Sequence, residues 1–327
     1  MKELLLTLAL CGDIMMGTTY PTVRLPQNDG KEIFADVAAL FQEADLAAGN
    51  LEGVICEGGT CTKNTGKANN YAFRMPESYA HLLKEAGFDY LNLANNHTND
   101  FGAYGLERTR EMLYDQGIKY SGLPDCESVV VVKDSVRFGI CSFGHNSYTL
   151  KHTDTATVSR IITELRPQCD ILVVTFHGGA EGSKYSHLPE GPETYLGENR
   201  GNLREFAHKC IDLGADVVFG HGPHVTRAVE LYNDHLIAYS LGNFCTTFGV
   251  NLAGVNGYAP VLVVKVDGEG RFVEGRIHSF IQTQGTGPKT DPTNRVAQHM
   301  RDLSIADFHG DCGLDISDDG TLTRKTR

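Results

Sequence analysis

Polar residues with the chemistry of metal ligands directly follow apolar segments at five places in the sequence. They are Gly12-Asp13 after LLLTLALC, Asn50-Leu51-Glu52 after ADLAAG, Asn95-Asn96-His97 after DYLNLA, His177-Gly178-Gly179 after ILVVTF, and His221-Gly222-Pro223-His224 after ADVVFG. Carboxylate and amide oxygens and neutral imidazole nitrogens bind Mn, Fe, Zn or Mg. Any one of these residues alone is explained as well by turn formation or capping. Five segments with the same ending predict a metal site, with one or two ions.

The apolar segments and the sequences between them predict an α/β fold. The segments are continuously apolar rather than alternating, which is typical of strands buried on both faces. Between them, apolar residues recur at helical spacing over 34–44, 79–86 and 203–211, the last two followed closely by Gly87 and Gly214. Strands that alternate with helices form sheets covered by helices, and sites in such folds lie at the carboxyl ends of strands.

The C-terminal part of the sequence has a different pattern. Two apolar runs flank Asp267-Gly268-Glu269-Gly270, which predicts a β-hairpin. An amphipathic stretch over 296–303 predicts a helix, and the polar ending DISDDGTLTRKTR predicts disorder. We therefore expect one main domain over 1–285, a helical segment over 286–310 packed on it, and a disordered tail over 311–327.

The overall composition excludes some classes of partner. The 327 residues carry 41 acidic and 29 basic side chains, a net charge of −12, and the basic residues form no dense cluster. Nucleic acid is therefore not an expected partner, since phosphate binding needs clustered Lys and Arg. Apart from the opening run, no apolar stretch approaches the length that spans a bilayer, so no membrane segment is expected.

The opening run MKELLLTLALC has two possible interpretations, an export signal or a buried strand. Glu3 offsets the charge of Lys2, and Leu10 precedes Cys11 where a lipid-modified cysteine needs a small residue. The strand interpretation fits better, because the run ends in Gly-Asp like the other strands. As it stands the chain is expected to be cytoplasmic, or extracytoplasmic if a leader was trimmed.

The nine cysteines are scattered and include no CxxC pair, so a thiolate zinc site is not expected. A local disulfide between Cys56 and Cys61 remains open at this point, although reduced thiols are the simpler interpretation.

Several longer motifs resemble the CapA family of capsule (poly-γ-glutamate) synthesis proteins, which is related to the calcineurin-like metallophosphoesterases. The resemblance covers about residues 5–285 and rests on GDIMMG, GNLEG, LANNHTNDFGAYGL, FHGGAE, GADVVFGHGPHV and YSLGNF. It implies a four-layer α-β-β-α sandwich of the metallophosphoesterase type.

The resemblance also implies roles for individual residues. The implied metal ligands are Asp13, Glu52, Asn96, His177, His221 and His224. His97 resembles the acid that protonates the leaving group, and Asp100 is either its orienting partner or the N-cap of the next helix. Met15 stands where phosphoesterases carry a second ligand histidine, and Asn50 and Glu52 stand in for a bridging aspartate. One or two divalent ions are therefore expected.

Two polar loops are the expected substrate contacts. Glu181 and Lys184 lie at the start of an insert that forms either a rim or an ordinary surface loop, and Arg74 follows Lys63 and Lys67 in another loop. Their basic groups suit an anionic small molecule or polymer.

The sequence supports two functions. The first is a metal-dependent hydrolase acting on a phosphoester or a γ-glutamyl polymer-related substrate. The alternative is a non-catalytic accessory or binding component of polymer assembly. The metal, the substrate and the oligomeric state are left open.

Overall fold

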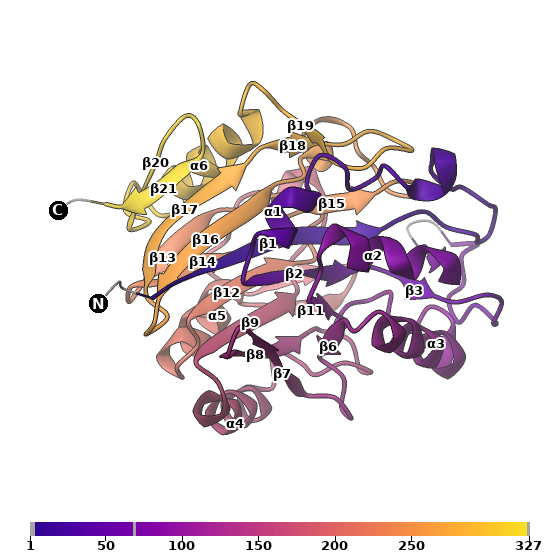
Figure 1. Ribbon diagram of the computed structural model, residues 1–327, viewed down its shortest axis with the longest axis horizontal. Coiled ribbons are helices and arrows are strands. Elements are labelled where there is room, and N and C mark those ends of the chain that lie inside the picture. The colour runs from indigo at the N-terminus through magenta and orange to yellow at the C-terminus, as the bar shows by residue number, and fades with distance from the viewer. Residues whose placement is uncertain (1–3, 68–69, 326–327) are drawn as a thin grey trace.

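Two large β-sheets pack face to face in the computed structural model, which describes residues 4–67 and 70–325 (Figure 1). In the first sheet the spatial order is β20-β21-β17-β16-β1-β2-β5-β6, and β15 pairs with the C-terminal end of β1. These strands are β1 (Leu5–Met15), β2 (Leu46–Leu51), β5 (Tyr90–Asn92), β6 (Lys119–Ser121), β15 (Asn243–Thr246), β16 (Val261–Asp267), β17 (Phe272–His278), β20 (Leu314–Ile316) and β21 (Thr321–Arg324).

The second sheet has the order β13-β14-β12-β9-β8-β7. Its strands are β7 (Ser128–Lys133), β8 (Val136–Phe143), β9 (Ile171–His177), β12 (Val217–His221), β13 (Val229–Tyr232) and β14 (His235–Ala238). The central strands β8, β9, β12 and β14 are parallel, as are β1, β2, β5 and β6 of the first sheet. In each sheet the carboxyl ends of the parallel strands therefore lie on the same side, where the strands end.

Strand β1 shows why the opening run is so apolar. Leu6, Leu8 and Leu10 point into the core between the sheets, whereas Ala9 and Cys11 point to the core beneath the helices. Both faces of the strand are buried, so alternation of polar and apolar residues is absent. The prediction that the run forms a first strand is confirmed from residue 5 onward; Met1, Lys2 and Glu3 lie outside the described residues.

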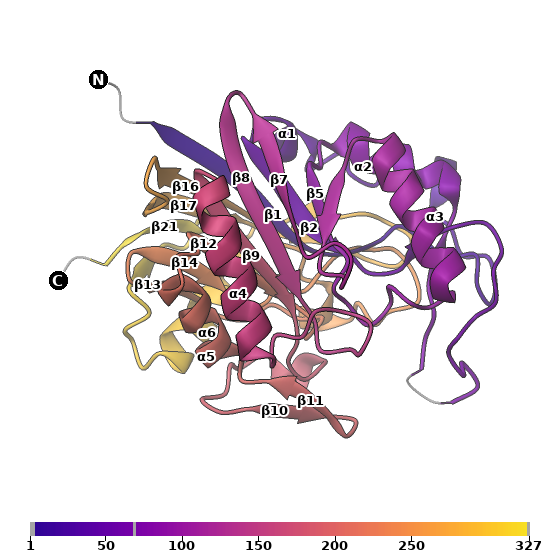
Figure 2. The same ribbon diagram turned by 90° about the horizontal axis from the view of Figure 1, so that it is seen from below.

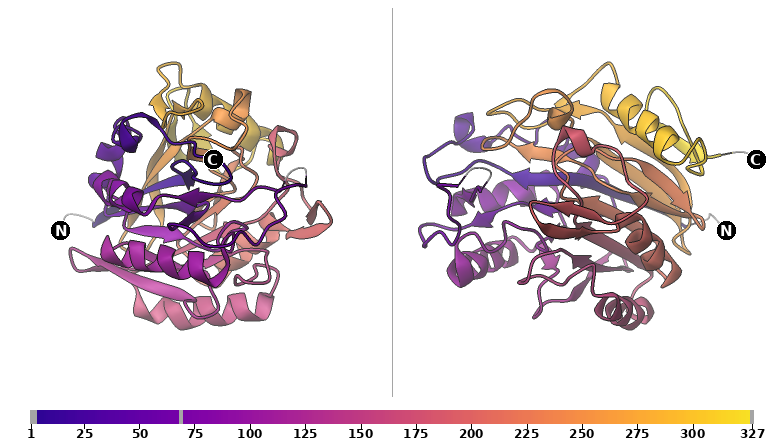
Figure 3. Two further views of the ribbon diagram at one scale, coloured as in Figure 1. Left: turned by 90° about the vertical axis from the view of Figure 1, so that its right-hand side faces the viewer. Right: turned by 180° about the vertical axis from the view of Figure 1, so that it is seen from behind.

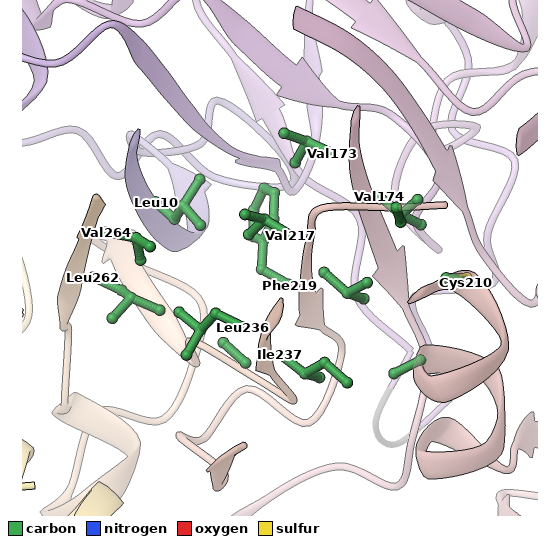
Figure 4. Close-up of a cluster of buried hydrophobic side chains, with 14 of the residues drawn as sticks. Leu10, Val173, Val174, Cys210, Val217, Phe219, Leu236, Ile237, Leu262 and Val264 are labelled. Carbon is green, nitrogen blue, oxygen red and sulfur yellow. The ribbon is translucent and has the colours of Figure 1, made fainter. Parts of the chain in front are cut away.

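The core between the sheets is built from aliphatic and aromatic side chains of both sheets. Leu10 and Leu262 of the first sheet face Val217, Phe219 and Leu236 of the second (Figure 4). All five are essentially inaccessible to solvent. Burial of each such side chain stabilises the fold by roughly 1.5–3 kcal/mol before the entropy of ordering it is subtracted.

Helices cover the outer faces of both sheets, which completes the four-layer sandwich. α1 (Ala38–Gln42), α2 (Ala80–Ala86) and α3 (Gly102–Asp115) lie beside the first sheet, and α4 (Thr155–Leu165) and α5 (Leu203–Asp212) cover the second (Figure 2). The helices predicted over 79–86 and 203–211 are confirmed, and Gly87 ends α2 in the left-handed conformation at φ 105°. The predicted helix over 34–44 is reduced to α1, preceded by turns.

A sixth helix, α6 (Arg295–Asp307), joins the two sheets at their edges (Figure 3). The Ser304 hydroxyl on α6 accepts a hydrogen bond from the backbone N–H of Val229 in β13, at 2.9 Å. The Ala297 N–H donates to the Ser279 hydroxyl, just beyond β17, at 3.0 Å. One helix is thus hydrogen-bonded to β13 of the second sheet and to the residue that follows β17 of the first.

The prediction of a disordered tail over 311–327 is wrong for the residues that the structure describes. β20 and β21 form a hairpin that extends the first sheet, and β21 pairs with β17. Leu314 and Leu322 are buried in the main core, so two apolar residues in a polar stretch suffice to order it. Thr326 and Arg327, the end of the predicted tail, lie outside the described residues.

Short strands fix the loops around the sheet edges. They are β3 (Val54–Ile55), β4 (Arg74–Met75), β10 (Glu193–Tyr195), β11 (Glu198–Gly201), β18 (Phe280–Ile281) and β19 (Lys289–Thr290). The insert after β9 forms the β10–β11 hairpin, which projects beyond the second sheet (Figure 2). All nine cysteines, Cys56 and Cys61 among them, are free thiols. In the described part of the chain, no helix has the length and apolar character required to cross a membrane.

Candidate metal centre

The carboxyl ends of strands from both sheets bring five of the six predicted ligands into one cluster, which consists of Asp13, Glu52, His177, His221 and His224. In the first sheet, β-pairing puts Asp13 opposite Asn50. In the second sheet, it puts His177 opposite His221. The ligands therefore stand at matching levels of neighbouring strands, and their side chains meet where the two sheet edges face each other.

Asp13 is surrounded by histidines. Its carboxylate lies 2.8 Å from His224 Nδ1 and 3.5 Å from His221 Nδ1. Burial alone would lower the pKa of His224, but the hydrogen bond to Asp13 and its negative charge outweigh burial and raise that pKa to about 10. Burial alone would raise the pKa of Asp13, and the neighbouring histidines bring it below its usual value. Asp13 and His224 thus form an ion pair.

Glu52 supplies a second buried carboxylate. Its Oε1 lies 3.4 Å from His177 Nε2 and 3.8 Å from His97 Nε2. Burial, followed by the charge of Asp13, raises the pKa of Glu52. The Asn50 amide donates to both carboxylates, to Asp13 at 2.8 Å and to Glu52 at 2.5 Å. Asn50 therefore holds two acids of like charge close together.

Several side-chain atoms of the predicted ligands are buried and have no hydrogen-bond partner. They are Glu52 Oε1, Asn96 Oδ1 and both ring nitrogens of His177 and His221. Buried polar atoms in folded proteins are nearly always paired, so unpaired ones mark a place where another group binds. Burial lowers the pKa of His177 to about 3 and that of His221 to about 4, which leaves both rings neutral, the form that ligates metals.

This donor set fits a divalent cation in its chemistry. Two carboxylates, one carboxamide oxygen and neutral imidazoles suit Mn, Fe or Zn. Within 4–67 and 70–325, however, no three His, Cys, Asp or Glu side chains already stand in the close arrangement of a formed metal site. Asp13 and Glu52 each contact two histidines, and the buried atoms without hydrogen-bond partners are the observation that favours a cation.

His97 and Asp100 form a hydrogen-bonded pair beside the cluster. His97 Nδ1 lies 2.8 Å from Asp100 Oδ2, which also accepts the Phe73 N–H at 2.7 Å. The N-cap of α3 is Phe101, and no side chain caps that helix end. Of the two sequence interpretations of Asp100, the N-cap is wrong, and the structure has the contact that an orienting partner makes.

The predicted substrate contacts differ in position. Glu181 lies at the cluster and accepts a hydrogen bond from Arg200 Nη1 at 2.8 Å. Arg74 donates to Gly58 O at 2.8 Å and to the Thr19 hydroxyl at 2.9 Å, so its guanidinium fastens loops to each other. Lys184 is exposed in the insert and makes no ion pair within the described part of the chain. A substrate role for these three residues stays a prediction.

Comparison with known proteins identifies the family. The family of bacterial capsule synthesis proteins PGA_cap matches residues 7–247. The chain belongs to this family. The resemblance read from the sequence motifs is thereby confirmed.

Two curated Bacillus proteins are similar to this chain in sequence. The chain is 32% identical over 251 residues to the capsule biosynthesis protein CapA of Bacillus anthracis, covering 73% of this chain and 59% of that protein. It is 29% identical over 256 residues to the PGA biosynthesis protein CapA of Bacillus subtilis (strain 168), covering 73% of this chain and 63% of that protein. The match therefore spans less than two thirds of either relative.

The fold is also found in a solved structure with low sequence identity to this chain. A solved structure of a novel phosphatase from Mycoplasma pneumoniae superposes with a TM-score of 0.53 at 14% identity, covering 90% of this chain and 97% of that one. At this identity the likeness concerns the fold alone. The predicted metallophosphoesterase-type sandwich is confirmed.

One residue at the centre of this PGA_cap chain escaped sequence analysis. His145 follows β8, and its ring stacks on that of His177 with centroids 5.5 Å apart. Its Nε2 lies 3.5 Å from a carboxylate oxygen of Glu198 on the β10–β11 hairpin. The buried Arg200 forms ion pairs with both Glu198 and Glu181. The signal was present, because RFGICSF is followed by Gly-His just as ADVVFG is followed by His-Gly.

Proposed function

We propose that this chain is a metal-dependent hydrolase of the capsule-synthesis family, acting on a phosphoester or on a γ-glutamyl bond. One observation carries the proposal. Buried atoms without hydrogen-bond partners occur on predicted ligands at four strand ends, and Glu52 among them lies beside a hydrogen-bonded His–Asp pair. In a protein with a purely structural role these atoms would bring no benefit, because each buried polar atom without a hydrogen-bond partner lowers the free energy of unfolding.

The residues that would hold the cation are Asp13, Glu52, Asn96, His177 and His221, together with His224 once its ring has lost a proton. A divalent ion bound there supplies Lewis acidity and lowers the pKa of a bound water. The protein's part is to fix the donors. Asn50 spaces the two carboxylates, and the pairing of β9 with β12 spaces His177 and His221.

His97 is the residue proposed to give a proton to the leaving oxygen. Its Nδ1 is held by Asp100, so Nε2 is the free nitrogen, and it faces Glu52 at the cluster. A general acid needs such an orienting partner and hydrogen-bond reach to the reacting atom. Phe73 packs on the ring with centroids 4.4 Å apart and restricts its rotation.

The substrate class is proposed from charge and from relatives. Lys184 is an exposed basic group in the insert, which suits an anionic small molecule or polymer. The related Bacillus proteins are named for capsule and PGA biosynthesis. Poly-γ-glutamate is therefore the first polymer to test, beside simple phosphoesters.

The experiment measures metal binding and hydrolysis separately. Metal-free protein is titrated calorimetrically with Mn²⁺ and Zn²⁺, and then given phosphomonoesters, phosphodiesters and poly-γ-glutamate. We expect binding and hydrolysis in the wild type and in His81→Gln, whose ring is exposed on α2 and lies against Ser78 O. His221→Gln should lose both. A protein that binds no metal and cleaves none of these substrates would refute the proposal.

The alternative is a non-catalytic component that binds polymer. It is favoured by Met15, which is fully buried and stands where the related phosphoesterases carry a ligand histidine. Binding of poly-γ-glutamate without cleavage, by protein that has been loaded with metal, would support this function.

A further inference from the structure

Lys63 contacts both members of the His97–Asp100 pair. Its Nζ lies 2.7 Å from Asp100 Oδ1 and 3.1 Å from His97 Nδ1. We propose that Lys63 is a positioning residue, which fixes the Asp100 carboxylate and through it the ring of His97. The inference rests on the proposed function, because it concerns the residue assigned there as the proton donor.

The two oxygens of Asp100 have different surroundings. Oδ2 is occupied by His97 and by the Phe73 N–H. Oδ1 has no hydrogen bond of ordinary geometry, and in the described part of the chain the ammonium group of Lys63 is its charged contact. Asp100 is completely buried, so removal of Lys63 would leave that oxygen without a cation in a place that water does not reach.

The loop that carries Lys63 is fastened to the same pair of residues. The Thr62 N–H donates to Asp100 O at 2.9 Å, and the Thr62 hydroxyl donates to Asn99 O at 2.7 Å. Farther along, Phe73 bonds Asp100 through its N–H and packs its ring on His97. Contacts on both sides of Lys63 therefore place its side chain at the His–Asp pair, although 21% of it stays exposed.

This arrangement defines how His97 can face the cluster. Nδ1 either donates to Asp100 or accepts from Lys63, and both contacts lie on the side away from Glu52. A rotation that turned Nδ1 toward the cluster would break both contacts. Lys63 thus restrains the ring so that Nε2 remains the nitrogen presented to the leaving oxygen.

The test compares Lys63→Met, Lys63→Arg and Lys67→Met. Methionine keeps the length of the side chain and removes the charge, and arginine keeps the charge. Lys67 is an exposed lysine of the same loop with no ion pair in the described part of the chain, so Lys67→Met is the matched control. The substrates are phenyl phosphate, with a poor leaving group, and p-nitrophenyl phosphate, with a good one.

We expect Lys63→Met to lower kcat for phenyl phosphate by roughly 10- to 100-fold, the cost of a misplaced catalytic group. KM should change little, and the loss should be smaller for p-nitrophenyl phosphate, which needs less proton donation. Lys63→Arg should recover part of the activity, and Lys67→Met should match the wild type. Equal losses for both leaving groups, or wild-type activity in Lys63→Met, would overturn the inference.

A measurement on metal-free protein separates this inference from the proposed function. Hydrogen exchange at the Thr62 and Phe73 amides should be faster in Lys63→Met than in Lys67→Met, because both amides bond Asp100. If the wild type hydrolyses nothing, the proposed function fails. Unchanged exchange in Lys63→Met would then overturn the positioning role by itself, whereas faster exchange would support it.

Discussion

Replacing Arg227 should destabilise the protein more than any surface substitution, because its guanidinium is fully buried and paired. Arg227 Nη1 and Nη2 each donate to a Glu193 carboxylate oxygen at 2.7 Å. Nε donates to Tyr185 O at 2.9 Å, and Glu193 also accepts the Ala180 N–H at 2.9 Å. The pair therefore fastens the hairpin insert to the loop that follows His177.

The expected loss in the free energy of unfolding follows from the burial of this ion pair. The side chains of Arg227 and Glu193 are 0% and 6% exposed. Removing one partner of such a pair leaves a buried charge without its counter-ion, at a cost of about 3–5 kcal/mol. Arg227→Met and Glu193→Gln should each lower the free energy of unfolding by this amount. The double variant Arg227→Met/Glu193→Met should lose less than either single variant, since no unpaired charge remains.

Guanidinium unfolding followed by far-UV circular dichroism measures these differences. Tyrosine fluorescence serves as the second probe, because the chain has 13 tyrosines and no tryptophan. Losses below about 1 kcal/mol in both single variants, the value of an exposed ion pair, would refute the reasoning. So would single losses that simply add in the double variant, because residues in contact should couple.

Two further predictions concern a buried histidine and a close-packed glycine. Burial lowers the pKa of His152 to about 3, so its ring is neutral in the folded protein near pH 7. In the unfolded chain a histidine takes up a proton near pH ~6.5. The neutral ring therefore contributes its full stability above pH ~6.5, and this contribution is lost as the pH falls toward 3. Between pH 7.5 and 5.5, His152→Gln should lose about 1.4 kcal/mol less unfolding free energy than the wild type; an unchanged pH dependence would contradict this. A Cβ at Gly12 would lie 1.9 Å from Gly242 O, so Gly12→Ala should cost about 1–3 kcal/mol and weaken metal binding in calorimetry. Gly268→Ala, whose nearest contact is 3.8 Å away, is the control and should be neutral, and similar melting temperatures for both variants would count against the argument.

The sequence predicted that polar side chains at several strand ends lie close together, because each of these strand ends carries a local signature. An apolar strand, a glycine and a polar side chain are adjacent in the chain, as in Gly12-Asp13 and His221-Gly222. The fold makes strand ends meet, so a local pattern repeated in several strands predicts a shared site. His145 carries the same signature, since Gly144-His145 directly follows the apolar run RFGICSF.

The contacts that hold the ligands could not be predicted in this way, because they join distant parts of the chain. Lys63 is 37 residues from Asp100, and Glu198 meets His145 through a hairpin that packs back on the site. Arg74 had the expected charge, but its contacts with Gly58 and Thr19 depend on how two loops fold together. The ordered tail was missed for a related reason, since Leu322 is buried by a sheet edge formed elsewhere.

The glycines beside the predicted ligands explain why the spacing of His177 and His221 depends on how the strands pack. Gly222 follows His221 at φ 114°, and a Cβ there would lie 2.4 Å from the carbonyl oxygen of Gly178, the residue after His177. The two histidine loops are thus packed backbone against backbone, and the Gly178 N–H donates to His221 O at 2.9 Å. Backbone contacts of this kind do not rotate like side chains, so the spacing of His177 and His221 is set by the strands β9 and β12 themselves. Variation in the insert can therefore change what reaches the centre while the donors keep their positions.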